Sequence, residues 1–436
     1  MAQKIQGTED LYGDYMRAWQ HMQDTARELF GAYGFDMIET PAIEQIDTFV
    51  HGIGESTDVV RKEMFRVVSG ALFSTLLEAG SEHGLKPRQR MAMRPEGTAG
   101  VVRAVVENNL VPQGSSPAKF WYAEAMFRGE RPQKGRLRQF HQIGLEWIGA
   151  SDAASDSECI IVLLEFFKRL GFDPAQLHVA LNSMGDEACR PAYREKVRQF
   201  IVDHQDAMCD DCLERAKINP LRSFDCKNEA CHAIMQQAPL VTDNLCDACV
   251  SHYDQVKAYL HKAGIAFSED PTLVRGLDYY TRTVFEIDVV GAAVGAIGGG
   301  GRYDGLVEVS GGKPTPAVGF AVGFERIMLA LASCGHPLEI PQPSCVYVAY
   351  TDAPQRQAVF DATLALRRAG IRAEADYQGR SLKSQFKQAD KLGASLCVII
   401  GEDELAHNYY TVRDMQTHEQ TCVEVDGLVA FVSEHC

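Results

Sequence analysis

Apolar residues recur every three or four positions near the start of the chain, a spacing that places them on one side of an α-helix. The residues with this spacing are Trp19, Met22, Ala26, Leu29 and Tyr33. The pattern predicts an amphipathic helix over residues 14–33 that ends at Gly34. The segment FDMIETPAI follows and predicts a strand interrupted at Pro41. A proline at this point favours an edge or interface strand over a central one.

Two further strands are predicted on either side of a polar loop, at AKFWYAEAMFR (residues 118–128) and RQFHQIGLEWIG (residues 138–149), and a helix over residues 155–170 follows. Because side chains alternate along a strand, the second strand has one mostly apolar face, formed by His141, Ile143, Leu145 and Trp147. The opposite face carries Arg138, Phe140, Gln142, Gly144 and Glu146. Gly144 is expected to leave a space between Gln142 and Glu146 that suits an ammonium group. A polar face in contact with solvent is the alternative.

Changes of pattern divide the chain into three parts. Residues 173–262 are helical in pattern, rich in cysteine and aspartate, and lack the glycine-rich segments found on both sides. We therefore expect an insertion at 173–262 within a core of residues 1–335. The proline-rich segment HPLEIPQPS predicts a linker. After it, strands and helices alternate, which predicts a small α/β domain with a parallel core at residues 343–436.

Composition narrows the class of protein. The chain has 436 residues, 46% of them hydrophobic, and a formal net charge of -16. No apolar run approaches the ~20 residues of a membrane span, and the N-terminus lacks an apolar signal segment, so we expect a cytoplasmic protein without membrane contact. Net acidity argues against non-specific coating of nucleic acid. A local exception lies between Arg128 and Arg138, where five cations accompany one anion, Glu130.

The thirteen cysteines predict thiols or metal ligands in such a compartment. Two CxxC pairs and two further cysteines stand close together in the expected insertion: Cys209, Cys212, Cys226, Cys231, Cys246 and Cys249. Two CxxC pairs could together close a tetrahedral zinc site. The sequence leaves open whether these residues bind zinc or remain free thiols.

Five segments in order resemble class II aminoacyl-tRNA synthetases, in the form found in the histidyl-tRNA synthetase family. FRGERPQKGRLRQFHQ is similar to motif 2, AVGFAVGFERIMLAL to motif 3, and LVRGLDYYTRTVFE to a signature of the histidyl enzymes. MRPEGTAGVVRA and GGGGRYDGL match as well. The resemblance spans essentially the whole chain. It implies an α+β fold, in which an antiparallel-sheet catalytic core carries a helical insertion and is followed by an α/β anticodon-binding domain.

The resemblance also implies a reaction. L-histidine would be attached to histidine tRNA through a histidyl-adenylate, with ATP as a substrate and Mg²⁺ as its counter-ion. The arginines implied at the reacting phosphates are Arg128, Arg275 and Arg326. Arg275 would stand where related synthetases place a metal ion. A guanidinium suits this chemistry because it holds phosphate oxygens in a bidentate manner and keeps its charge.

The family pattern assigns three groups of binding residues. Those implied for histidine are Glu96, Gly97, Thr98, Arg128, Gln142, Glu146, Arg275, Tyr279 and Tyr280. Those implied for ATP are Arg128, Glu130, Arg138, Phe140 and Arg326. Those implied for the tRNA acceptor end are Arg131, Gln133, Lys134 and Arg136. In the C-terminal part, Lys383, Lys387 and Lys391 form a basic stripe. Such a stripe is usually a solvated helix face, but the resemblance relates this one to the anticodon.

The resemblance has further implications. The first helix and the strand containing Pro41 resemble motif 1, which implies a homodimer. Any zinc at the cysteines would be structural, since family members without them are common. The alternative function is a non-catalytic regulatory subunit of histidine biosynthesis built on the same core. Such proteins lose catalytic arginines and usually the anticodon domain, whereas Arg128, Arg275 and Arg326 are all present here, so the sequence favours the enzyme.

Overall fold

The computed structural model describes residues 2–55, 57–81, 84–112, 116–292, 294–335, 337–340 and 345–435. Tertiary contacts separate residues 1–340 from residues 341–436. Each unit has hydrophobic clusters of its own. The predicted start of the C-terminal domain, residue 343, lies outside the described residues. Within the described ranges, no helix is long and apolar enough to cross a membrane.

An eight-stranded sheet organises the first unit, in the order β1-β5-β6-β11-β10-β9-β7-β8. Its strands are β1 (Asp36–Met37), β5 (Ala118–Phe127), β6 (Gln139–Ile148), β11 (Ala317–Gly323), β10 (Gly298–Arg302), β9 (Thr281–Val289), β7 (Leu177–Ser183) and β8 (Ser268–Glu269). The strands from β5 to β7 pair antiparallel, and the two end pairs are parallel. The expected antiparallel-sheet core is therefore confirmed.

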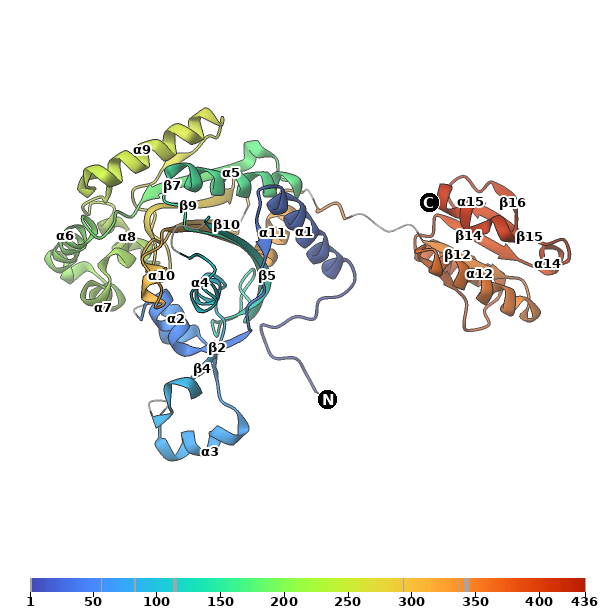
Figure 1. Cartoon of the computed structure of the whole chain (residues 1–436), viewed down its shortest axis with the longest axis horizontal. Coiled ribbons are helices and arrows are strands. Elements are labelled where there is room, and N and C mark those ends of the chain that lie inside the picture. The colour runs from blue at the N-terminus through green and yellow to red at the C-terminus, as the bar shows by residue number, and fades with distance from the viewer. Residues whose placement is uncertain are drawn as a thin grey trace. The chain divides into compact units, whose positions relative to one another are not determined.

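Helices cover both faces of this curved sheet. Figure 1 shows the sheet bending around α4 (Thr98–Glu107), with α5 (Ala153–Arg169) and α9 (Asp247–Lys262) on its outer face. Apolar residues of α1 (Gly13–Ala32), α5 and α11 (Phe324–Ser333) form a core with the outer face. Trp19, Met22, Ala26 and Leu29 are buried there, as their spacing predicts. The predicted first helix is thus confirmed to within one residue at each end.

Shorter elements complete the first unit. A separate three-stranded sheet contains β2 (Ile43–Gln45), β4 (Met91–Met93) and β3 (Arg66–Val67). The chain leaves β1 and enters β2 on either side of Pro41, as the interrupted strand predicts. The remaining helices around this region are α2 (Ile46–Ile53), α3 (Gly70–Ala79) and α10 (Leu306–Val309).

The predicted insertion at 173–262 is not helical throughout. Leu177–Ser183 form β7, which pairs with β9 inside the main sheet, so the helical interpretation is wrong for these residues. The α-helices of this region follow β7: α6 (Arg190–Asp203), α7 (Asp210–Ile218), α8 (Glu229–Met235) and α9, with the 3₁₀ segment η6 (Pro220–Asp225) between α7 and α8. Residues 179–183 are buried without alternation, because β7 lies inside the sheet with both faces covered, so this strand lacks the period-2 pattern that identifies a half-buried strand.

The second unit has the expected parallel core. β13 (Ala373–Ala375), β12 (Val346–Tyr350) and β14 (Leu396–Ile400) pair in parallel, and β15 (Tyr409–Asp414) and β16 (Gln420–Glu424) extend the sheet antiparallel. Its helices include α12 (Arg356–Arg368), α13 (Leu382–Lys391), α14 (Glu402–Ala406) and α15 (Leu428–His435). On α13, Gln385 and Ala389 are buried while the basic stripe of Lys383, Lys387 and Lys391 is exposed.

Candidate active site

A cavity of about 360 Å³ lies against β6, β10 and β11 in the first unit. Twelve of the residues assigned from the sequence line it: Glu96, Thr98, Arg128, Glu130, Arg136, Phe140, Gln142, Glu146, Arg275, Tyr279, Tyr280 and Arg326. These residues come from distant parts of the chain, and pairing of the central strands brings them together. The assignment of their roles stays a prediction, but their convergence makes this cavity the candidate active site.

The alternation along β6 places its polar residues as predicted. Phe140, Gln142 and Glu146 line the cavity, while Ile143 and Leu145 are buried in the core on the other face. The predicted space at Gly144, however, is already filled. A Cβ atom at Gly144 would lie 2.2 Å from the ring of Tyr122 on β5, the strand partner of this glycine. The expectation that Gly144 leaves room for a ligand is therefore wrong.

The same tyrosine ring explains a second glycine. A Cβ atom at Gly97 would lie 2.3 Å from the ring of Tyr122. Gly97 does not line the cavity, unlike Glu96 and Thr98 on either side of it. The ring of Tyr122 is therefore held between Gly97 and Gly144. Gly97 leaves room for this ring, which packs beneath the cavity.

Glu146 is the most deeply buried carboxyl group of the cavity, at 1% exposure. Thr98 Oγ1 donates a hydrogen bond of 2.7 Å to Glu146 Oε1, and the hydroxyl of Tyr303 donates to Oε2. Burial raises the pKa of Glu146 to about 8, because the charged form loses its hydration. A cationic ligand beside Glu146 would restore the ionised form.

Glu96 is a second buried carboxyl group at the same end of the cavity. Its oxygens accept hydrogen bonds from the backbone N–H groups of Thr98 and Ala99 at 2.9 and 2.8 Å, at the start of α4. These bonds satisfy donors that a helix leaves unpaired at its N-terminus. Burial nevertheless raises the pKa of Glu96. Two buried acidic groups at one end of the cavity favour an ammonium ligand.

Gln142 supplies an acceptor that the protein leaves unused. Its Oε1 is buried and has no hydrogen-bond partner among the described residues. Buried polar atoms are nearly always paired, so an unpaired one that lines a cavity indicates a place for a polar ligand. Tyr279 and Tyr280 lie on the same cavity with ring centroids 4.6 Å apart.

Arg275 lies over the glycine strand β10. A Cβ atom at Gly299 would be 2.9 Å from Arg275 Nη1, so only glycine leaves room for the guanidinium there. Nη1 forms an ion pair with Glu286 of β9. Burial alone would lower the pKa of Arg275, but attraction to Glu286 and to the tyrosine oxygens outweighs it and raises the pKa. Arg275 is therefore a fixed positive charge in the cavity.

Two other arginines, Arg128 and Arg326, also line the cavity. Arg128 Nε donates to the carbonyl of Pro95 at 2.9 Å, and its guanidinium lies 5.2 Å from the centroid of the Phe140 ring. Arg326 follows the predicted turn at Gly323 and donates to the carbonyl of Ala296 at 2.8 Å. Burial, together with the positive charges of Arg136 and Arg128, lowers the pKa of Arg326. Mutual repulsion of this kind is relieved by a bound anion.

The basic loop divides into two parts. Gln133 and Arg136 are joined by backbone hydrogen bonds of 3.0 and 2.9 Å, and Gly135 between them has φ +76°. Arg131, Gln133 and Lys134 are exposed. Arg136 instead turns toward the cavity, where it pairs with Glu130 at 3.4 Å.

Arg138 does not line the cavity, although the family pattern assigns it to ATP. Its Nη1 contacts the carbonyl of Gln6 and its Nε the carbonyl of Glu130, both at 3.4 Å. Its backbone N–H donates to the carbonyl of Gly7 at 2.7 Å. In this structure Arg138 connects the loop to the N-terminal segment.

Sequence reasoning missed three polar residues of this site. Glu286 pairs with Arg275, Tyr303 bonds to Glu146, and Tyr122 fills the space below the site. Glu286 and Tyr303 both lie within segments that resemble family motifs, but no role followed from their position alone. Tyr122 could have been found only from the register of β5 against β6.

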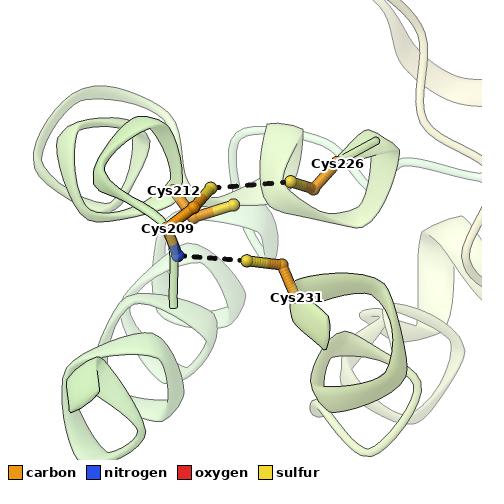
Figure 2. Close-up of side chains that lie close together, drawn as sticks. All are labelled: Cys209, Cys212, Cys226 and Cys231. Atoms are coloured by element: carbon orange, nitrogen blue, oxygen red, sulfur yellow. Dashed lines mark hydrogen bonds between the residues drawn. The ribbon is translucent and has the colours of Figure 1, made fainter. Parts of the chain in front are cut away.

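The six clustered cysteines do not form one group. Cys209, Cys212, Cys226 and Cys231 lie together (Figure 2), whereas Cys246 and Cys249 lie with Asp186 and Cys189. The expectation that the two CxxC pairs close one site is therefore wrong. The physical reason is that one pair begins α7 and the other begins α9, and these helix starts face different partners.

Comparison with known proteins gives a consistent result. A family model described as histidyl-tRNA synthetase matches residues 85–327, and one described as anticodon binding domain matches residues 346–435. The histidine–tRNA ligase of Halothermothrix orenii is 44% identical over 424 residues, which cover 97% of each protein. That of an Anaeromyxobacter species is 42% identical over 431 residues, or 98% of this chain and 99% of the relative.

Solved structures agree with the sequence relatives. The apo histidyl-tRNA synthetase of S. aureus superposes with a TM-score of 0.80 at 32% identity, and the match covers 99% of both chains. A likeness over the full length includes the sheet, the helical region after β7 and the C-terminal unit.

Proposed function

The chain belongs to the histidyl-tRNA synthetase family, and we infer that it is a class II enzyme that attaches L-histidine to tRNA at the expense of ATP. The observation that carries this function is that three arginines and two buried carboxyl groups line the same cavity. The arginines are Arg128, Arg275 and Arg326, and the buried carboxyl groups belong to Glu96 and Glu146. Such a cavity suits an amino acid beside a polyphosphate, and Mg²⁺ enters with ATP as part of that substrate.

In the first step, a carboxylate oxygen of histidine attacks the α-phosphorus of ATP. A new P–O bond forms and pyrophosphate leaves, which gives histidyl-adenylate. Two anions must approach each other, and negative charge builds on the α-phosphate as they do. Arg128 and Arg275 offset this charge because both are held in place by protein contacts before substrate arrives. Arg326, whose pKa is lowered by burial and by the positive charges of Arg136 and Arg128, binds the γ-phosphate.

Recognition of histidine uses the acidic end of the cavity. Glu146 and Glu96, with Thr98, bind the α-ammonium group, and the unpaired Oε1 of Gln142 accepts one of its hydrogen bonds. Tyr279 and Tyr280 close over the imidazole. A pocket that hydrogen-bonds imidazole nitrogens rejects apolar amino acids strongly, because the wrong ligand leaves buried polar groups unpaired.

In the second step, the terminal ribose hydroxyl of the tRNA attacks the acyl carbon, and the adenylate is released as AMP. Arg131 and Lys134 are exposed at the tip of the basic loop and contact phosphates of the acceptor end. Gln133 lies between them, where it can meet a base edge. The C-terminal domain, residues 343–436, binds the anticodon through the basic stripe of α13.

The active form is a homodimer. Its support lies at the edge of the main sheet, where the two-residue strand β1 is solvent-exposed. Met37 and Ile43, on either side of Pro41, are 48% and 47% exposed. Exposed apolar side chains beside a sheet edge are usually covered by a partner. Light scattering at assay concentration measures the mass, and a stable, active monomer would exclude the dimer.

A regulatory subunit of histidine biosynthesis is not favoured. Relatives that share more than two fifths of their residues over nearly the full length are named histidine–tRNA ligases, and the three cavity arginines are retained here. ATP–pyrophosphate exchange decides the matter: the enzyme should catalyse exchange with histidine and with no other amino acid. A protein that binds histidine but shows no exchange would be a regulatory subunit.

A further inference from the structure

Four cysteine side chains converge in the helical region after β7. Cys209 and Cys212 stand at the start of α7, Cys226 follows η6, and Cys231 belongs to α8. Figure 2 shows the four side chains pointing toward one another, and all four sulfur atoms lie within 4.8 Å of one another. Three separate segments of the chain therefore deliver their sulfurs to one point.

The spacing of the sulfurs fits one tetrahedral ion. A Zn–S bond of about 2.3 Å places the sulfurs of a tetrahedral site about 3.8 Å apart. Cys209 Sγ and Cys226 Sγ are separated by 3.8 Å. A disulfide would need about 2.05 Å. An iron–sulfur cluster contains several atoms between its ligands and would hold the sulfurs further apart.

The surroundings of the sulfurs also suit bound thiolates. Cys212 and Cys231 have no exposed surface, and both pack within an apolar cluster. The backbone N–H of Cys209 donates to Cys231 Sγ at 3.1 Å, a bond that stabilises negative charge on sulfur. Four uncharged thiols would gain little from lying close together. Four thiolates, in contrast, would each be attracted to a dication at their centre.

We propose that Cys209, Cys212, Cys226 and Cys231 bind one structural Zn²⁺ ion. The thiols lose their protons as the ion binds, so the site forms more readily as pH rises. Four sulfur ligands leave no open coordination position, which fits a structural role.

A second group of residues independently meets the same geometric requirement. Cys189 Sγ and Cys249 Sγ are 3.9 Å apart, and Asp186 Oδ1 lies 3.6 Å from Cys189 Sγ and 3.7 Å from Cys246 Sγ. A tetrahedral zinc with one oxygen and three sulfur ligands separates oxygen from sulfur by about 3.6 Å. The other oxygen of Asp186 pairs with Arg282 at 3.2 Å, which orients the carboxylate. This second set, with Cys246 as its fourth member, binds a second Zn²⁺ ion.

Both ions would stabilise contacts to the segment around Asp278, Tyr279 and Tyr280, which carries the tyrosines of the candidate active site. Residues 213–225 run between two ligands of the first site, and Asn219 within them donates to Asp278 Oδ1 at 2.7 Å. Arg190, next to the second site, donates to the carbonyl of Tyr280. Since this consequence rests on the proposed function, the first test of the zinc sites measures metal and not activity.

Metal analysis of the full-length protein, produced with zinc available and purified without chelator, should give two zinc ions per chain. The paired variant Cys226→Ser/Cys231→Ser should retain one, and so should Cys246→Ser/Cys249→Ser. Cys422→Ser, at an exposed cysteine of the C-terminal unit, should retain both. A wild-type ratio near zero, or iron in place of zinc, would refute both sites. If the wild-type protein holds one ion and only the Cys226/Cys231 variant loses it, the first site is supported and the second is refuted. If only the Cys246/Cys249 variant loses that ion, the second site is supported and the first is refuted.

A second measurement on the wild-type protein guards against variants that fail to fold. Titration of the cysteines with an organomercurial, followed with a zinc indicator, should release two zinc ions per chain. It should also lower the midpoint of thermal unfolding by several degrees. Thiol counting in denaturant with a chelator should find all thirteen cysteines. A disulfide mapped to any of the seven cysteines of the two sites would overturn the site to which that cysteine belongs. If zinc is present but histidine-dependent exchange is absent, the proposed function fails while the zinc sites stand.

Discussion

Arg275 and Glu286 form an ion pair at the edge of the cavity, with side chains that are 20% and 32% exposed. The pair connects the segment before β9 to the middle of β9. It fixes one end of the guanidinium, while Arg275 Nε is buried without a partner among the described residues. An arginine held in this way can offer its remaining donors to a phosphate with little reorganisation.

Removal of Arg275 should therefore slow formation of the adenylate far more than transfer to tRNA. We expect Arg275→Ala to reduce the adenylation rate about 10² to 10³-fold, by analogy with loss of one preorganised donor. Lysine should restore only part of the rate, because a point charge cannot copy the bidentate guanidinium. Transfer should suffer much less, since that step breaks the bond at the acyl carbon.

Single-turnover kinetics of the two steps provide the measurement. Preformed histidyl-adenylate isolates the transfer step in the same variant. Adenylation near the wild-type rate would disprove the role of Arg275, and so would a collapse of transfer while adenylation survives.

Glu146 should lose a proton when histidine binds. Its pKa of about 8 means that the free site is mainly protonated at pH 7, and an ammonium group beside it favours the ionised form. Binding at pH 7 should release a proton to solvent, and affinity should rise with pH up to about 8. Calorimetry in two buffers of different ionisation enthalpy counts the protons, with Glu146→Gln as the control that releases fewer. Equal proton release by both proteins would exclude Glu146 as the source.

The exposed and cavity-facing parts of the basic loop should have separable effects. Neutralising Arg131 and Lys134 together should weaken tRNA charging. It should also reduce the salt dependence of tRNA binding, by about one unit of slope for each phosphate that the loop no longer binds. Pyrophosphate exchange should remain near the wild-type rate. Arg136→Ala should instead slow exchange, because Arg136 lines the cavity beside Arg326. Similar losses in both assays for both variants would mean that the loop acts as one unit.

Gly144→Ala should destabilise the protein and weaken histidine binding. The added methyl group would meet the rigid ring of Tyr122, not a flexible side-chain end, and overpacking of this kind costs about 1–3 kcal/mol. Gly31→Ala is the matched control, because that helical glycine has open space around its Cβ position and should be neutral or slightly stabilised. Thermal unfolding with and without histidine measures both effects. A stable Gly144→Ala protein with normal affinity would contradict this packing.

The pattern of apolar and polar residues was sufficient to predict features that depend on a single strand or helix. Alternation along β6 predicted that Phe140, Gln142 and Glu146 share a face, and the cavity confirms this placement. The same pattern did not predict features that depend on how a neighbouring strand packs. Tyr122 occupies the space at Gly144 because the register of two strands places them opposite each other, and no single strand records its register.

The cysteines show the same limit at longer range. Spacing identified two CxxC pairs, but they stand at the starts of two different helices, and Asp186 and Cys189 join the second pair from a different segment. The positions of the Arg136 and Arg138 side chains likewise could not be predicted from the sequence. They are two residues apart, yet the turn at Gly135 and contact with Gly7 send one into the cavity and the other to the N-terminal segment.

The glycine strand β10 has a bearing on inhibitors of this enzyme. A Cβ atom at Gly298, Gly299, Gly300 or Gly301 would approach a neighbouring atom to 2.7, 2.7, 2.0 or 2.4 Å. At three of these positions that neighbour is a backbone carbonyl oxygen, which cannot move aside as a side chain can. Cells that acquire drug resistance by point mutation must change a residue without losing the enzyme. A compound that packs against Gly298 and Gly299, the two of these glycines that line the cavity, would therefore meet positions at which resistance has few available substitutions.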